Sequence, residues 1–123
     1  MSRKILPINI RFETEFGQLY TLSFYRTRYV TGNTCLCCNC TEDGKFYEPY
    51  ATISKNFPEL KYYVSDFEIC VDVNNIGRKL FNELIELGIL TYIRRDIESG
   101  YCTYPICTID EEWYNNLPHR EDK

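Results

Sequence analysis

The chain has 123 residues, a formal net charge of −4, and a sequence in which 44% of the residues are hydrophobic. This length suffices for one hydrophobic core, and the apolar share is too high for a disordered chain. We therefore expect a single domain over residues 1–123, in which residues 118–123 form a flexible tail. The acidic balance argues against non-specific binding of nucleic acid, because such affinity comes mainly from clustered Lys and Arg side chains.

The N-terminal segment predicts a β-hairpin. Apolar and polar residues alternate over residues 5–12 and 18–29, which is the period of half-buried strands, and Gly17 lies between the two stretches. Because successive side chains of a strand point to opposite faces, one face of the second strand carries three apolar side chains. These are Tyr20, Leu22 and Phe24.

A second hairpin is predicted around Asp43 and Gly44, since this dipeptide is a strong signal for a two-residue turn. Its first strand is the cysteine-rich segment, residues 35–40. Pro49 cannot donate a backbone hydrogen bond to a central strand, so we expect the second strand to begin at Tyr50.

The clearest single element is an amphipathic helix over about residues 75–87. Gly88 is suited to end it, because glycine readily adopts the left-handed conformation that often follows a helix. The apolar residues of this helix recur at helical spacing, at Ile76, Leu80, Leu84 and Leu87.

The remaining elements are predicted strands and one short helix. Residues 69–73 form a short strand before the main helix, and residues 89–97 and 101–109 form a hairpin after it. Asp110 caps a short C-terminal helix. The predicted fold class is therefore α+β, with an antiparallel β-sheet of hairpins and one main amphipathic helix packed on one face.

Seven cysteines make up the most conspicuous chemical feature. Four of them, Cys35, Cys37, Cys38 and Cys40, supply on paper the ligand set of a tetrahedral zinc site. Strand alternation places the first two on one face and the other two on the opposite face, so one ion cannot collect all four. A mixed zinc site would need a distant ligand, and the alternative is that these residues are small buried side chains. The candidates for a distant ligand are Cys70, Cys102, Cys107 and His119.

Catalytic motifs are missing from the sequence. His119 is the single histidine and follows a proline near the end of the chain, which leaves no base for a cysteine or serine nucleophile. The six glycines stand singly and form no phosphate-binding loop. We therefore predict a protein that is not an enzyme and that has no cofactor other than the zinc considered above.

Eleven tyrosines exceed what the core of such a small chain needs, and tyrosine provides rigid contact area at protein interfaces. We predict a protein partner, with single-stranded nucleic-acid binding as an alternative, because aromatic and basic side chains on a sheet can stack bases. Tyr47 is a further candidate for exposure. The predicted partner-binding residues are Tyr25, Arg26, Arg28, Tyr29, Tyr62, Tyr63, Tyr101 and Tyr104.

Two segments, residues 49–56 (Pro-Tyr-Ala-Thr-Ile-Ser-Lys-Asn) and 99–107 (Ser-Gly-Tyr-Cys-Thr-Tyr-Pro-Ile-Cys), resemble a family of small uncharacterised bacterial domains of unknown function. The resemblance covers about residues 45–109. It implies an accessory protein of a phage or mobile element. A natural role for such a protein is to inhibit a host defence system, such as a CRISPR effector nuclease or its complex with RNA.

The N-terminal residues carry neither the apolar run of a signal peptide nor that of a membrane helix. We therefore expect a cytoplasmic protein that does not bind membranes. In a reducing compartment its cysteines are free thiols or metal ligands rather than disulfides.

Overall fold

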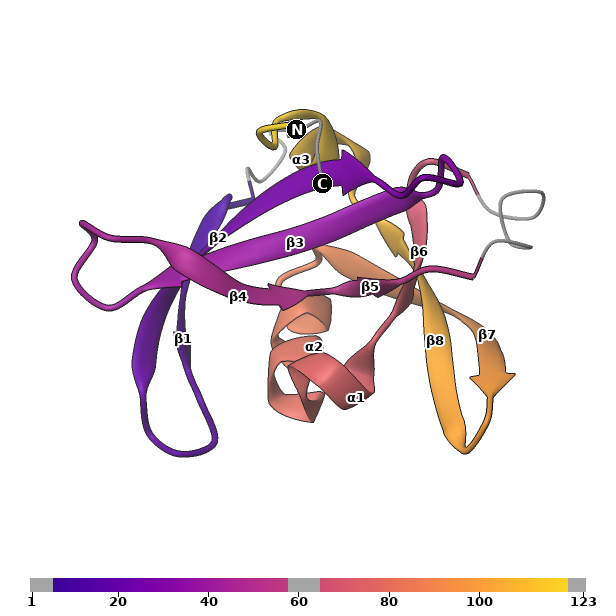
Figure 1. Cartoon of the computed structure of the whole chain (residues 1–123), viewed down its shortest axis with the longest axis horizontal. Coiled ribbons are helices and arrows are strands. Elements are labelled where there is room, and N and C mark those ends of the chain that lie inside the picture. Colours follow the sequence, from indigo (N-terminus) through magenta and orange to yellow (C-terminus); the bar gives the residue numbers. More distant parts are fainter. Residues whose placement is uncertain (1–5, 58–64, 120–123) are drawn as a thin grey trace, which may run out of the picture.

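The computed structural model describes residues 6–57 and 65–119, and over these residues it contains two four-stranded antiparallel sheets and three short helices (Figure 1). This arrangement confirms the predicted α+β class. The strands form two sheets rather than the single predicted one.

The first sheet has the strand order β1-β2-β3-β4 and consists of consecutive hairpins, as predicted. Its strands are β1 (Asn9–Glu13), β2 (Leu19–Arg28), β3 (Thr34–Thr41) and β4 (Glu48–Thr52). Contrary to the prediction, Pro49 lies inside β4. The sheet tolerates this proline because β4 is an edge strand and because its pairing with β3 shifts register between Cys38 and Asn39.

The second sheet has the order β5-β6-β8-β7. Its strands are β5 (Ser54–Lys55), β6 (Glu68–Val71), β7 (Leu90–Ser99) and β8 (Cys102–Ile109). The predicted hairpin after the main helix corresponds to β7 and β8, and the short predicted strand before it to β6.

Ile53 joins the two sheets. Its amide donates to the carbonyl of Leu36 in β3 at 2.7 Å, and its carbonyl accepts from the amide of Asp72, just after β6, at 2.8 Å. The amide of Leu36 donates to a side chain of the next segment, Ser54 Oγ, at 3.1 Å. One continuous segment, β4 through β5, therefore belongs to both sheets (Figure 1).

The predicted single helix is two helices, α1 (Val73–Ile76) and α2 (Arg78–Glu86). The break occurs at Gly77, whose φ of 88° lies outside the helical range and is accessible mainly to glycine. Of the predicted apolar residues, Leu80 and Leu84 are buried in α2 together with Phe81, whereas Leu87 is only partly buried.

The short C-terminal helix α3 (Glu111–Asn115) begins where predicted. Asp110 caps it, because the carboxylate accepts a hydrogen bond from the amide of Trp113 at 3.0 Å. The indole of Trp113 donates to the carbonyl of Pro7 at 2.6 Å and packs edge-on against Phe24.

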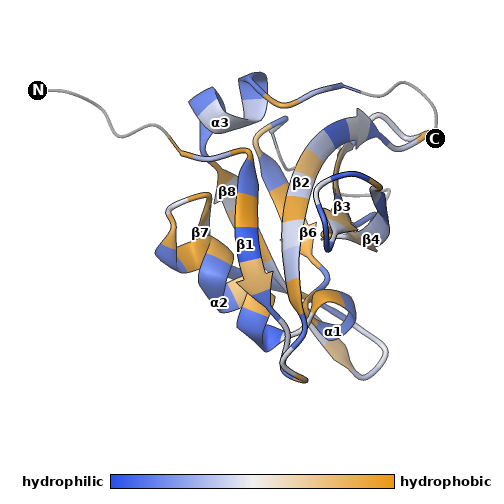
Figure 2. Ribbon diagram, turned by 90° about the vertical axis from the view of Figure 1, so that its left-hand side faces the viewer, coloured by the Kyte–Doolittle hydropathy of each residue, from blue (hydrophilic) through white to orange (hydrophobic). Residues whose placement is uncertain are grey.

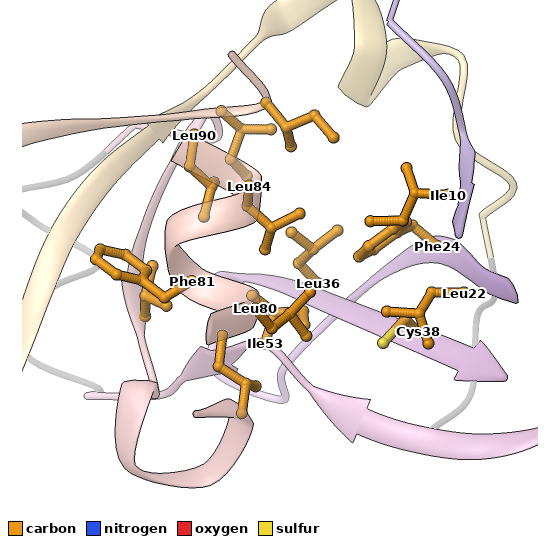
Figure 3. Close-up of a cluster of buried hydrophobic side chains, with 14 of the residues drawn as sticks. Ile10, Leu22, Phe24, Leu36, Cys38, Ile53, Leu80, Phe81, Leu84 and Leu90 are labelled. Atoms are coloured by element: carbon orange, nitrogen blue, oxygen red, sulfur yellow. The ribbon is translucent and has the colours of Figure 1, made fainter. Parts of the chain in front are cut away.

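The main core lies between the sheets and α2 (Figure 3). The predicted apolar face of β2 is confirmed, because Leu22 and Phe24 are buried in this core and Tyr20 packs against it. Figure 2 shows the corresponding alternation of hydrophobic and hydrophilic residues along β1 and β2. Within the part of the chain that the structure describes, no helix is long and apolar enough to cross a membrane.

Candidate functional site

The four clustered cysteines lie on β3 in two pairs that face opposite ways. Cys38 and Cys40 belong to the core, whereas the sulfurs of Cys35 and Cys37 lie 3.5 Å apart on the other face of the sheet. All four residues are buried. Among residues 6–57 and 65–119, no three His, Cys, Asp or Glu side chains converge as a metal site would require.

The pKa is raised for Cys37, Cys38 and Cys40. Burial raises the pKa of Cys38 to about 12. The pKa of Cys37 is also raised, first by the hydrogen bond with the thiol of Cys35 and then by burial. Such groups are poor nucleophiles at neutral pH, because the thiolate is the reactive form.

The two predicted arginines are engaged in contacts within the molecule. The guanidinium of Arg26 lies 4.9 Å from the centre of the Tyr114 ring, and its Nε donates to the carbonyl of Leu117 at 3.3 Å. Arg28 forms an ion pair with Asp66 at 3.0 Å. Both guanidinium groups therefore hold neighbouring segments of the chain together. This leaves them less available for ionic contacts with a phosphate backbone.

Tyr104 was predicted to be exposed, and this prediction is wrong. Its side chain is only 8% exposed, because on β8 it points to the same side as the fully buried Ile106 and packs edge-on against Phe57. Tyr101, in the β7–β8 turn, is fully exposed as predicted.

Tyr25 and Tyr29 are partly buried at the outer face of the first sheet. The hydroxyl of Tyr29 donates to the carbonyl of Ser54 at 3.0 Å, so this ring bridges the two sheets. The remaining predicted residues, Tyr62 and Tyr63, lie outside the described residues.

Among the described residues, four of the seven large exposed hydrophobic side chains lie in two loops that the sequence did not indicate as a site. We call the two loop segments 13–19 and 42–48 the acidic end of the molecule. Strand pairing brings them together, since Thr21 pairs with Thr41 and Cys40 pairs with Glu48. Both loops therefore leave the first sheet at the same strand ends, and in Figure 1 the β1–β2 loop points to the bottom of the view whereas the β3–β4 loop points to the left. The large exposed hydrophobic residues here are Phe16, Leu19, Phe46 and Tyr47.

Short-range hydrogen bonds fix the backbone at both phenylalanines. The Oγ1 of Thr14 accepts from the amide of Phe16 at 3.3 Å and from that of Gln18 at 3.1 Å. In the other loop, Oδ1 of Asp43 accepts from the amide of Phe46 at 3.3 Å and from that of the preceding lysine at 2.8 Å. Each Phe is therefore presented to solvent by an ordered turn.

Charge concentrates around these apolar side chains. The acidic end holds five carboxylates and one lysine, so its formal charge equals the −4 of the whole chain. The acidic residues are all exposed and are Glu13, Glu15, Glu42, Asp43 and Glu48.

A cleft of about 290 Å³ opens beside Phe16, on the core side of the first sheet. The rings of Tyr20 and Tyr50, 5.9 Å apart, line it together with residues of α1. Exposed Lys79 stands at its border. The cleft is large enough to receive one bulky side chain of a partner.

Sequence reasoning included Tyr47 among the exposed tyrosines but missed Phe16, Leu19 and Phe46. The available signal was an aromatic residue inside a turn, since Phe16 directly precedes Gly17 and Phe46 follows the Asp43 turn. Turn residues are usually exposed, so an aromatic side chain there indicates a contact surface.

Comparison with known protein families identifies a match over most of the chain. Residues 22–121 match the model of a family described as a domain of unknown function (DUF4313). The match includes the cysteine strand and most of the first sheet, so it extends well beyond the resemblance expected over residues 45–109. No match was found among curated proteins or solved structures.

Proposed function

The chain belongs to the DUF4313 family, whose description names no activity. From the geometry of the chain, we propose that it is a non-enzymatic protein-binding module. The acidic end is its contact surface. One observation carries the proposal. Phe16 and Phe46 are 90% and 79% exposed, although the backbone of each is held in place by hydrogen bonds.

Ordered loops reduce the cost of association, because little conformational entropy remains to be lost on binding. Burying an exposed phenylalanine in an interface yields roughly 1.5–3 kcal/mol. The cleft beside Phe16 can receive an anchoring side chain of the partner. Interfaces commonly draw most of their binding energy from a few such side chains in pockets.

The charge of the acidic end defines the partner. Five exposed carboxylates lie in the same two loops as the apolar side chains, so the complementary surface combines apolar side chains with Lys and Arg. Surfaces with which proteins hold nucleic acid are rich in these residues. We therefore propose that the partner is a nuclease or nuclease–RNA complex of a host defence system, such as a CRISPR effector. The protein itself then acts as an inhibitor encoded by a phage or mobile element.

Co-purification from host extract tests the proposal with three proteins: the wild type, F16S/F46S and Y101S. Tyr101 is an equally exposed aromatic residue in a hairpin turn away from the acidic end, so Y101S is the matched control. We expect one specific protein that is retained by Y101S and lost from F16S/F46S, and whose binding weakens with rising salt. The same partner in equal amount with both variants, or no specific partner, overturns the proposal.

The inhibitory role has its own readout. Addition of the wild type to a purified effector nuclease should reduce its cleavage of DNA, and F16S/F46S should not. Binding without any effect on cleavage would retain the binding module and refute inhibition.

A further inference from the structure

The two sulfurs on the outer face of β3 form a feature that the proposed function does not use. Cys35 and Cys37 are separated by one residue, and their Sγ atoms lie 3.5 Å apart. The side chains are 6% and 7% exposed, which places the sulfurs just below the surface.

These two thiols are badly placed to form a disulfide. Residues two apart on a strand have Cα atoms roughly 6.6–6.8 Å apart, and their Cβ atoms, which point the same way, are similarly separated. A disulfide needs Cβ atoms about 3.5–4.5 Å apart. Closing the bond would bend β3, which is hydrogen-bonded to β2 on one side and β4 on the other.

A shared ion needs no such bending. With metal–sulfur bonds of about 2.3 Å, sulfurs 3.5 Å apart subtend an angle of about 100° at a common ion, close to the tetrahedral value. The observed sulfur separation therefore already has the dimensions of a two-sulfur chelate.

The surroundings of the pair are polar. The hydroxyl of Tyr25 is hydrogen-bonded to Cys37, and Thr52 Oγ1 lies 4.0 Å from the sulfur of the same residue. Thr27 pairs directly with Cys35 across the strands, and its buried hydroxyl has no hydrogen-bond partner. Buried hydroxyls usually have such a partner, so the Thr27 hydroxyl is available to a group bound beside Cys35.

We propose that Cys35 and Cys37 bind one thiophilic divalent cation of the zinc group, with water filling the remaining positions. Binding replaces two protons by one ion: the two thiols and M²⁺ give the neutral dithiolate chelate and two H⁺. Cys38 and Cys40 take no part, because they face the core. With only two strong protein ligands the site holds its ion less tightly than a four-cysteine site.

Titration of the purified, reduced protein with Cd²⁺ tests the proposal, because cadmium–thiolate bonds absorb in the ultraviolet. We expect one equivalent of Cd²⁺ to bind and Zn²⁺ to compete for the same site. The C35S and C37S variants should lose this absorption. The C40S variant is the matched control, since Cys40 is also 7% exposed and lies on the same strand but on the opposite face.

A second measurement uses the wild type alone. Each Cd²⁺ that binds should release two protons, one from each thiol, which a weakly buffered titration records as acidification. Absence of cadmium binding to the wild type, equal binding by folded C37S, or binding without proton release would overturn the proposal.

Discussion

Removal of the Ser54 hydroxyl probes the joint between the two sheets. Ser54 Oγ is the acceptor for the amide of Leu36, which is completely buried. The substitution S54A leaves that amide without a partner, and an unsatisfied buried donor costs about 1–3 kcal/mol. We therefore expect a loss of about 2 kcal/mol in the free energy of unfolding.

Urea denaturation followed by the fluorescence of Trp113, the single tryptophan, measures this loss. With a slope of about 2 kcal/mol per M, the midpoint should fall by about 1 M. The comparison is Y29F, which removes a hydrogen bond to the Ser54 carbonyl but leaves no buried amide without an acceptor. This variant should lose only about 1 kcal/mol in the free energy of unfolding. A loss below about 0.5 kcal/mol in S54A, or a larger loss in Y29F, would refute the reasoning.

Three further predictions concern single side chains. Replacing Asp110 by Ala should destabilise the protein by about 1 kcal/mol in the same denaturation assay, because α3 loses its cap on Trp113, whereas D110N should retain most of the stability. Hydrogen bonds from backbone amides, first that of Lys45 and then that of Phe46, lower the pKa of Asp43. Its carboxylate therefore favours the ordered loop above the unfolded-state pKa, and this contribution is lost as the pH falls through the lower folded-state value. Amide NMR signals of the loop should accordingly titrate below the usual Asp range near about 3.9, and a midpoint at or above it contradicts the assignment. Finally, burial raises the pKa of Cys38 to about 12, so iodoacetamide at pH 8 should leave this residue unmodified in the folded protein, as mass spectrometry can verify.

The local pattern of the sequence was sufficient for most individual elements. Strand alternation located β2 and its buried face, and Asp43-Gly44 located the connection of the β3–β4 hairpin, although this connection is the longer loop 42–47 rather than the predicted two-residue turn. These predictions succeeded because each depends on residues within one or two elements. The break at Gly77 was missed because the apolar spacing continues through it, and only the backbone conformation reveals it.

The division into two sheets depends on contacts that are distant in sequence. Ile53 hydrogen-bonds with Leu36 on one side and Asp72 on the other, and no local pattern encodes that pairing. The same limit applies to the candidate site. The turns that hold Phe16 and Phe46 are visible in the sequence, but their position at the same strand ends depends on the register of three strand pairs.

Residue composition was a weaker guide to exposure. Tyrosine was taken as a marker of the surface, yet Tyr104 lies in the smaller core and Tyr29 spans the joint between the sheets. A tyrosine can bury its ring while its hydroxyl forms a hydrogen bond, so the number of tyrosines in a sequence does not by itself identify an interface. Phenylalanine in a turn was the more informative residue.

The segment shared by both sheets also determines how the domain unfolds. Separation of the sheets requires the backbone bonds of Ile53 to break on at least one side, and the fully buried Ile53 side chain then leaves the core. The two halves therefore unfold as one cooperative unit. In native-state hydrogen exchange, the amide of Ile53 should open only with the whole domain, and a chain cut at this residue should yield no independently folding fragment.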